Sequence, residues 1–235
     1  VQTVDNRGFN LPATAAEEID GVTYGNDFTS DVEVRRAINI GIDRDEMIRN
    51  VLNGYGTPAY SVCDKMPWYN EETEVEYDQD KAKEILDAAG WEAGDDGIRE
   101  KDGVRAEFTM IYPASDSVRQ ALAEDSKNQL SELGIEVTTE GVDWDTAYTR
   151  AESVDKYMDE ALAASDLESS YDLWKKAQWD GETGITQEGD IPWIWLCNID
   201  HLYFVKNGLK IADQKIHPHG HGWSIVNNVD QWTWE

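Results

Sequence analysis

The sequence predicts an α/β fold with a mixed sheet and flanking helices. The main observation is a strand–helix–strand pattern: residues 106–112 alternate apolar and polar side chains, residues 115–133 space their apolar side chains as a helix does, and residues 135–139 form another apolar strand. Two strands joined by a helix pair in parallel through a right-handed crossover. The length of 235 residues fits one large domain or two small ones.

Two consecutive helices are predicted over residues 31–52. Thr29-Ser30-Asp31 offers capping side chains, and Gly41 with Asp43 indicates a break between the helices. Asn53-Gly54 ends the second helix. A further helix is predicted to begin after the cap Asp78 and to end at Gly90.

The regions on either side of these helices have weaker patterns. Residues 1–4 are a candidate strand, and the rest of the first 30 residues is predicted to be loop. Residues 55–76 form a long irregular segment, and such segments inside a compact domain are either functional or wrap a core. Residues 98–100 lie between two tight turns, which indicates a hairpin.

The last third of the chain combines helix, strand and loop signals. Residues 143–182 have helical spacing. Residues 190–205 are the most apolar run there and predict one or two buried strands. The tail beyond residue 210 is predicted to be loop.

The charge balance excludes some classes of partner. Forty-eight acidic residues against twenty basic ones give a net charge of −28, which repels the phosphates of nucleic acid and an anionic membrane face. No apolar run approaches membrane-spanning length, so we expect no membrane insertion. Cys63 and Cys197 are compatible with a disulfide, with two buried thiols, or with one metal ligand and a bystander; buried thiols are the favoured interpretation.

Three of the four histidines, His217, His219 and His221, alternate within five residues near the end of the chain. Imidazole is the commonest ligand of late first-row divalent metals, and the neighbouring glycines let the rings turn toward one centre. A solvent-exposed polar loop is the alternative interpretation. The histidines are therefore candidate metal ligands.

No catalytic signature is present. The sequence contains no GxSxG, HExxH, P-loop or GxGxxG motif. Asp200-His201 is a candidate acid–base pair, but a buried histidine with satisfied hydrogen bonds is the simpler interpretation. We therefore expect a protein that is not an enzyme.

Four stretches, in order, resemble the family-5 extracellular solute-binding proteins of ABC importers, the peptide- and nickel-binding group. They are Asp31-Val32-Glu33-Val34-Arg35-Arg36-Ala37-Ile38-Asn39-Ile40-Gly41-Ile42-Asp43-Arg44, residues 77–91, the turns of residues 96–103, and Gln129-Leu130-Ser131-Glu132-Leu133-Gly134-Ile135-Glu136-Val137. Residues 198–205 and the His-Pro-His-Gly-His-Gly-Trp tail are similar to the nickel-type members.

The resemblance implies a two-lobed, periplasmic-binding-protein-like (type II) protein that closes on its ligand and delivers it to a membrane permease. The implied ligand is nickel or a nickel–chelator complex, with an oligopeptide as the alternative, and no further cofactor is required. The resemblance places His217, His219 and His221 near the nickel site and Asn6 and Arg7 in the ligand cleft. It implies an extracytoplasmic protein, periplasmic or a cell-surface lipoprotein, whose signal peptide is not in this chain.

The resemblance also implies a domain organisation. Residues 1–190 would form the second lobe, shortened near residues 150–154, and residues 191–235 would return toward the hinge and a first lobe that this chain lacks. We expect a monomer whose partners are the ABC permease, the missing lobe and a small-molecule or metal ligand. The alternative is a trimmed structural domain that binds no ligand of its own.

Overall fold

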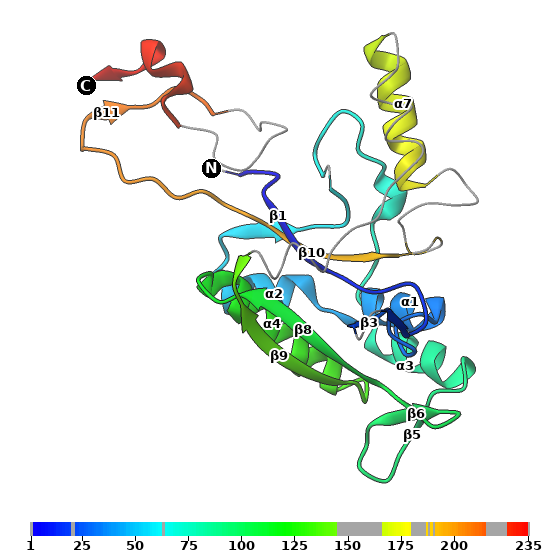
Figure 1. Ribbon diagram of the computed structural model, residues 1–235. Coiled ribbons are helices and arrows are strands. Elements are labelled where there is room, and N and C mark those ends of the chain that lie inside the picture. The colour runs from blue at the N-terminus through cyan, green and yellow to red at the C-terminus, as the bar shows by residue number, and fades with distance from the viewer. Residues whose placement is uncertain are drawn as a thin grey trace.

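Figure 1 shows a computed structural model of the chain, which describes residues 2–19, 22–62, 64–144, 166–179, 187, 189, 191–214 and 225–234. The predicted α/β fold is present. Helices pack against a parallel strand pair and against a separate antiparallel sheet, and smaller hairpins lie at the periphery. One large hydrophobic core joins these layers.

The parallel unit is the one predicted from the strand–helix–strand pattern. Strand β8 (Glu107–Pro113) pairs in parallel with β9 (Glu136–Val142), and α4 (Ser117–Ser131) connects them. Leu122 and Leu130 of α4 are buried in the core. The amphipathic connection thus covers one face of the pair.

Three further helices carry the predicted caps. They are α1 (Val32–Gly41), α2 (Arg44–Val51) and α3 (Gln79–Ala88), and each begins after an aspartate whose side chain accepts a backbone N–H of the first turn. The predicted break between the first two helices is confirmed, because Ile42 has an extended backbone between them. The caps satisfy N–H groups that the helices leave unpaired.

The antiparallel sheet has the order β1–β10–β4, with β1 (Asn6–Asn10) and β4 (Gly56–Pro58) on either side of β10 (Trp193–Ile199). The strand expected over residues 1–4 is wrong in position: the described residues before Asn6 form no strand, and the strand starts where β10 offers a partner. The loop expected over the first 30 residues is likewise interrupted by strands.

Shorter elements complete the described structure. The hairpin predicted around residues 98–100 is confirmed, because Asp102 and Gly103 adopt φ values of 53° and 81° in its turn. The other elements are β2 (Glu17–Ile19), β3 (Val22–Tyr24), η1 (Glu71–Thr73), β5 (Glu92–Ala93), β6 (Arg99–Lys101), β7 (Val104–Arg105), α7 (Leu167–Gln178), β11 (Leu209–Lys210), η2 (Ile225–Gln231) and β12 (Thr233–Trp234). The last two, η2 and β12, lie in the tail beyond residue 210, where only loop was expected.

Only the first part of the apolar run at residues 190–205 forms a buried strand, β10. Ile194 and Leu196 of β10 are buried, but Leu202, Phe204 and Val205 are 57%, 103% and 45% exposed and belong to no strand. The reason is the length of the partners: β4 pairs with β10 only as far as Ile199. Apolar character alone therefore did not predict where the strand ends. No helix in the described part of the chain has the length and apolarity needed to cross a membrane.

Candidate functional site

The carboxyl ends of β8 and β9 lie side by side at one end of the parallel pair. In open α/β sheets, ligands bind outside the carboxyl ends of the strands, so this edge of the pair is a candidate ligand site. Asp116 lies there as the N-cap of α4, and its Oδ1 accepts the N–H groups of Val118 and Arg119 at 3.1 and 2.9 Å. Its Oδ2 forms an ion pair with the Arg119 guanidinium.

Arg119 also stacks on an exposed aromatic ring. Its Cζ lies 5.1 Å from the ring centroid of Trp144, which follows β9 and is 40% exposed. Among the described residues, no acceptor contacts Nε or Nη2 of Arg119. An exposed indole beneath a guanidinium with unused donors can bind a planar or anionic group. We call this pair the Arg119–Trp144 shelf.

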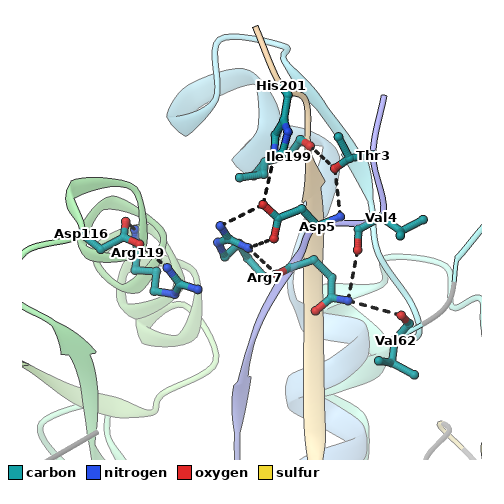
Figure 2. Close-up of polar contacts among 10 residues, drawn as sticks. Thr3, Val4, Asp5, Arg7, Val62, Asp116, Arg119, Ile199 and His201 are labelled. Atoms are coloured by element: carbon teal, nitrogen blue, oxygen red, sulfur yellow. Dashed lines mark hydrogen bonds and ion pairs between the residues drawn. The ribbon is translucent and has the colours of Figure 1, made fainter. Parts of the chain in front are cut away.

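A second polar cluster, Thr3, Asp5, Arg7 and His201, lies where β1 meets the end of β10 (Figure 2). Arg7 Nη1 is 2.5 Å from Asp5 Oδ1, and His201 Nε2 is 3.2 Å from Asp5 Oδ2. Thr3 Oγ1 donates to the carbonyl of Ile199 at 2.6 Å and accepts the N–H of Asp5 at 2.9 Å. The cluster ties the residues before β1 to the end of β10.

The two clusters are electrostatically connected. Figure 2 shows the Arg7 guanidinium on the side of β1 that faces the Asp116–Arg119 pair. Burial raises the pKa of Asp116, but the N–H and guanidinium of Arg119 and the charge of Arg7 outweigh burial, so the pKa lies below its ordinary value. The Asp116 carboxylate therefore stays ionised between two guanidinium groups.

The two predicted cleft residues, Asn6 and Arg7, are neighbours on β1, and Arg7 belongs to the second polar cluster. Among the described residues, Asn6 Nδ2 contacts only the carbonyls of Val4 and Val62, each at 3.4 Å. The Arg7 side chain is 10% exposed and pairs with Asp5. In the candidate acid–base pair Asp200-His201, the imidazole of His201 contacts the Asp5 carboxylate at 3.2 Å.

The candidate metal ligands His217, His219 and His221 lie outside the described residues. Within the described part of the chain, no group of three or more His, Cys, Asp or Glu side chains is arranged to hold a metal ion. Cys197 is a buried free thiol, as expected, and burial raises its pKa to about 12; Cys63 is outside the described residues.

Sequence reasoning missed Asp5, Asp116, Arg119 and Trp144. A usable signal existed for the last three, because they directly follow the two strands of the predicted parallel pair and therefore lie at its carboxyl edge. Asp5 carried no such signal. Its partners come from β1 itself and from a residue 196 positions away.

Comparison with known proteins adds a family to this geometry. Residues 7–188 match the family described as bacterial extracellular solute-binding proteins, family 5 middle region. The chain is 42% identical over 125 residues to Protein XP55 of Streptomyces lividans, covering 52% of this chain and 23% of that protein. It is 28% identical over 241 residues to the oligopeptide-binding protein AppA of Bacillus subtilis, covering 92% of this chain and 43% of AppA.

Solved structures show the same fold. NikZ of Campylobacter jejuni, crystallised in complex with Ni(L-His), matches with a TM-score of 0.69 at 21% identity, over 99% of this chain and 52% of NikZ. The predicted periplasmic-binding-protein-like (type II) α/β fold is therefore confirmed. The chain spans less than half the length of the curated relatives XP55 and AppA. Because the family match extends over most of its residues, the chain belongs to the bacterial extracellular solute-binding proteins of family 5.

Proposed function

We propose that this chain is part of the extracytoplasmic substrate-binding component of an ABC importer and forms one wall of its ligand site. The observation that carries the proposal is the exposed Arg119–Trp144 shelf at the carboxyl edge of β8 and β9, with Arg7 facing it. In this proposal Asn6 and Arg7 line the same cleft. Residues 1–190 correspond to the second lobe, and residues 191–235 return toward the first lobe. The family consists of solute-binding transport proteins and not of enzymes, which agrees with the lack of catalytic signatures.

The proposed ligand is nickel held by a small organic chelator. Support comes from the similarity to NikZ, which was crystallised with Ni(L-His), over nearly the whole chain. The three alternating histidines supply the ligand type that nickel prefers. An amino-acid chelator would bring a carboxylate to the guanidinium of Arg119 or Arg7. The expected partner is an ABC permease, and the expected location is the periplasm or the outer cell surface.

Replacing His217, His219 and His221 together with alanine is expected to abolish nickel uptake by the chain. The reason is that each imidazole removed takes away one nitrogen ligand, and the described residues, which do not include these histidines, contain no group that could hold a metal ion. Calorimetric titration with Ni²⁺ measures the uptake. The matched control is His201→Ala, which removes the remaining histidine, held by Asp5, and should keep the nickel binding. Equal uptake by the triple variant and the unmodified chain would contradict the assignment.

An oligopeptide is the second candidate ligand. It is favoured by the similarity to AppA, named for oligopeptide binding, across 92% of this chain. Native mass spectrometry of the purified protein separates the candidates, because a retained peptide and a retained nickel chelate differ in mass and isotope pattern. If the protein retains neither ligand, and neither Ni²⁺ with L-histidine nor a pentapeptide binds to it, the interpretation as a structural domain without a ligand is favoured.

Arg119→Gln is expected to weaken binding of either ligand class about tenfold, roughly 1.4 kcal/mol, because a charged donor and its stacked geometry are lost from the proposed wall. The probes are Ni²⁺ with L-histidine and a pentapeptide, titrated by calorimetry. The control is Arg105→Gln. Arg105 ends β7, close to the start of β8 and so away from the carboxyl edge, and it pairs with Asp96, Glu107 and Glu136. If both variants bind like the unmodified chain, the shelf is not part of the site.

A further inference from the structure

The irregular segment after β4 is held by a carboxyl group that forms no ion pair with any described residue. Within this segment, defined as residues 59–62 and 64–70, Asp64 is 4% exposed. Its Oδ2 accepts from Asn198 Nδ2 at 2.9 Å, and both its oxygens lie 3.3 Å from the N–H of Tyr60. Among the described residues, no lysine, arginine or histidine forms an ion pair with it. A buried carboxylate held only by neutral donors is costly.

Asn198, which donates to Asp64, has a side-chain oxygen that no described donor reaches. Asn198 lies on β10, between β1 and β4, and is 1% exposed. Its Oδ1 is buried, and no donor among the described residues reaches it. A protonated Asp64 would supply an O–H, and a turned Asn198 amide would accept it. The pair can therefore keep a hydrogen bond in either charge state, and it is the burial of Asp64 that favours the neutral acid.

Asp64 sits at the centre of the contacts that hold the segment down. Gln178, the last residue of α7, accepts from Ser61 Oγ at 2.8 Å and donates to the carbonyl of Trp68 at 3.0 Å. On the other side, the Arg44 guanidinium of α2 lies 5.2 Å from the centroid of the Tyr60 ring. The segment is thus pinned to α7, α2 and β10, and of these contacts the one to β10 runs through a carboxyl group.

We propose that Asp64 is a pH-sensitive latch, which holds the segment closed against β10 when it is protonated and lets the segment open when it is ionised. The inference does not depend on which ligand the protein binds. Opening of the segment would also affect Asn6, because its Nδ2 contacts the carbonyl of Val62 in the segment. Opening would therefore release a side chain of β1 as well as the Asn198 face of β10.

The direction of the pH effect follows from proton linkage. Burial raises the pKa of Asp64 to about 6, against the hydrogen bonds from Asn198, Tyr60 and Ser61, while an opened segment returns it to the ordinary 3.8. Between these two values the closed state binds more protons, so closure loses stability as the pH rises. The opening equilibrium should increase about 100-fold from about pH 4 to about pH 8, tenfold per pKa unit.

The buried arginine and tyrosines around Asp64 do not produce this pH dependence of opening. Burial lowers the pKa of Arg44 only to about 10, and it raises the pKa of Tyr60 and Tyr69 above the ordinary tyrosine value. These side chains keep one charge state through the pH range of the test. The charged and titratable groups that face Asp64 or its neighbours are Arg44 and Asp45 from α2, Tyr60, Lys65 and Tyr69 from the segment, Glu74 after η1, and Cys197 from β10; α7 contributes the neutral Gln178.

Hydrogen exchange followed by mass spectrometry tests the latch on the full chain. After correction for the chemical exchange rate, amides of the segment should open about 100-fold more at about pH 8 than at about pH 4, with the amides of α4 as internal reference. Asp64→Asn should remove this pH dependence. Asp95→Asn changes the same charge on the exposed turn before β6 and should keep it. A flat profile in the unmodified chain, or an unchanged slope in Asp64→Asn, overturns the inference.

Two further measurements keep the test decisive if Asp64→Asn does not fold. Ser61→Ala removes the hydrogen bond to Gln178 and should raise opening by the same factor at every pH, leaving the slope unchanged. The carboxyl carbon of Asp64, followed by NMR in the unmodified chain, should titrate near pH 6. A midpoint near pH 4, or a slope that disappears in Ser61→Ala, counts against the latch.

Discussion

Replacing Arg44 with methionine is expected to lower the free energy of unfolding by about 4 kcal/mol. Arg44 is 4% exposed at the start of α2. Its Nε donates to the carbonyl of Trp195 at 2.7 Å and to that of Ala59 at 3.1 Å, and its Nη2 donates to Oδ1 of Asn39 at 2.6 Å. One side chain therefore joins α1, α2, β10 and the residue that follows β4.

The size of the effect comes from the groups left behind. Methionine fills a similar volume, but the carbonyls of Trp195 and Ala59 and the Asn39 amide oxygen lose a charged donor in a place that water does not reach. Each buried acceptor without a donor costs about 1–3 kcal/mol. Denaturant unfolding followed by circular dichroism measures the loss. Arg49→Met on the exposed face of the same helix is the matched control and should change stability by no more than about 0.5 kcal/mol.

A small loss in Arg44→Met, close to that of the control, would mean that the carbonyls find other donors. Arg44→Lys separates charge from geometry. A lysine keeps the positive charge but has no planar fork to reach three acceptors at once, so we expect it to restore only part of the stability.

Local chemistry explains which parts of the fold were predictable. The helices were found because Asp31, Asp43 and Asp78 stand just before apolar side chains at helical spacing, and caps act within one turn. The parallel pair was found because a strand, a helix and a strand in sequence leave few topologies. Arg44 was not recognised as buried. It lies between two aspartates, and its acceptors come from distant elements.

The candidate site was less predictable for the same reason. Asn6 and Arg7 came from the family resemblance, but nothing in the local pattern indicated that Arg7 would pair with Asp5 or face Asp116. Both contacts depend on how β1 lies against β10 and on where α4 begins. The strand β1 was itself misplaced, because its five residues pair with residues of β10 that lie far away in the sequence, from Asn6 with Asn198 to Asn10 with Trp193.

The pairing of β1 with β10 brings the two backbones and the Trp193 ring close together at Gly8. Gly8→Ala is expected to lower the free energy of unfolding by about 3 kcal/mol. A Cβ at Gly8 would stand 2.2 Å from Nε1 of Trp193 and 2.4 Å from the carbonyl oxygen of Ile194. The backbone of Gly8 is extended, so conformational strain is not the cause; the indole simply lies across the glycine. The Trp193 ring cannot move freely either, because it stacks 5.2 Å from Trp195.

Relief of the clash requires β1 and β10 to separate near the bulge between Arg7 and Gly8. Thermal or denaturant unfolding measures the loss, and Asn10→Ala, at the exposed end of the same strand, is the control with little expected effect. Separation should also loosen the contact between Asp5 and His201, which NMR would detect as a change in the chemical shifts of the His201 ring at a fixed pH. If Gly8→Ala is as stable as Asn10→Ala and the chemical shifts of the His201 ring are unchanged, β1 tolerates a side chain at this position. The close approach of Trp193 would then not be what holds the β1–β10 register in place.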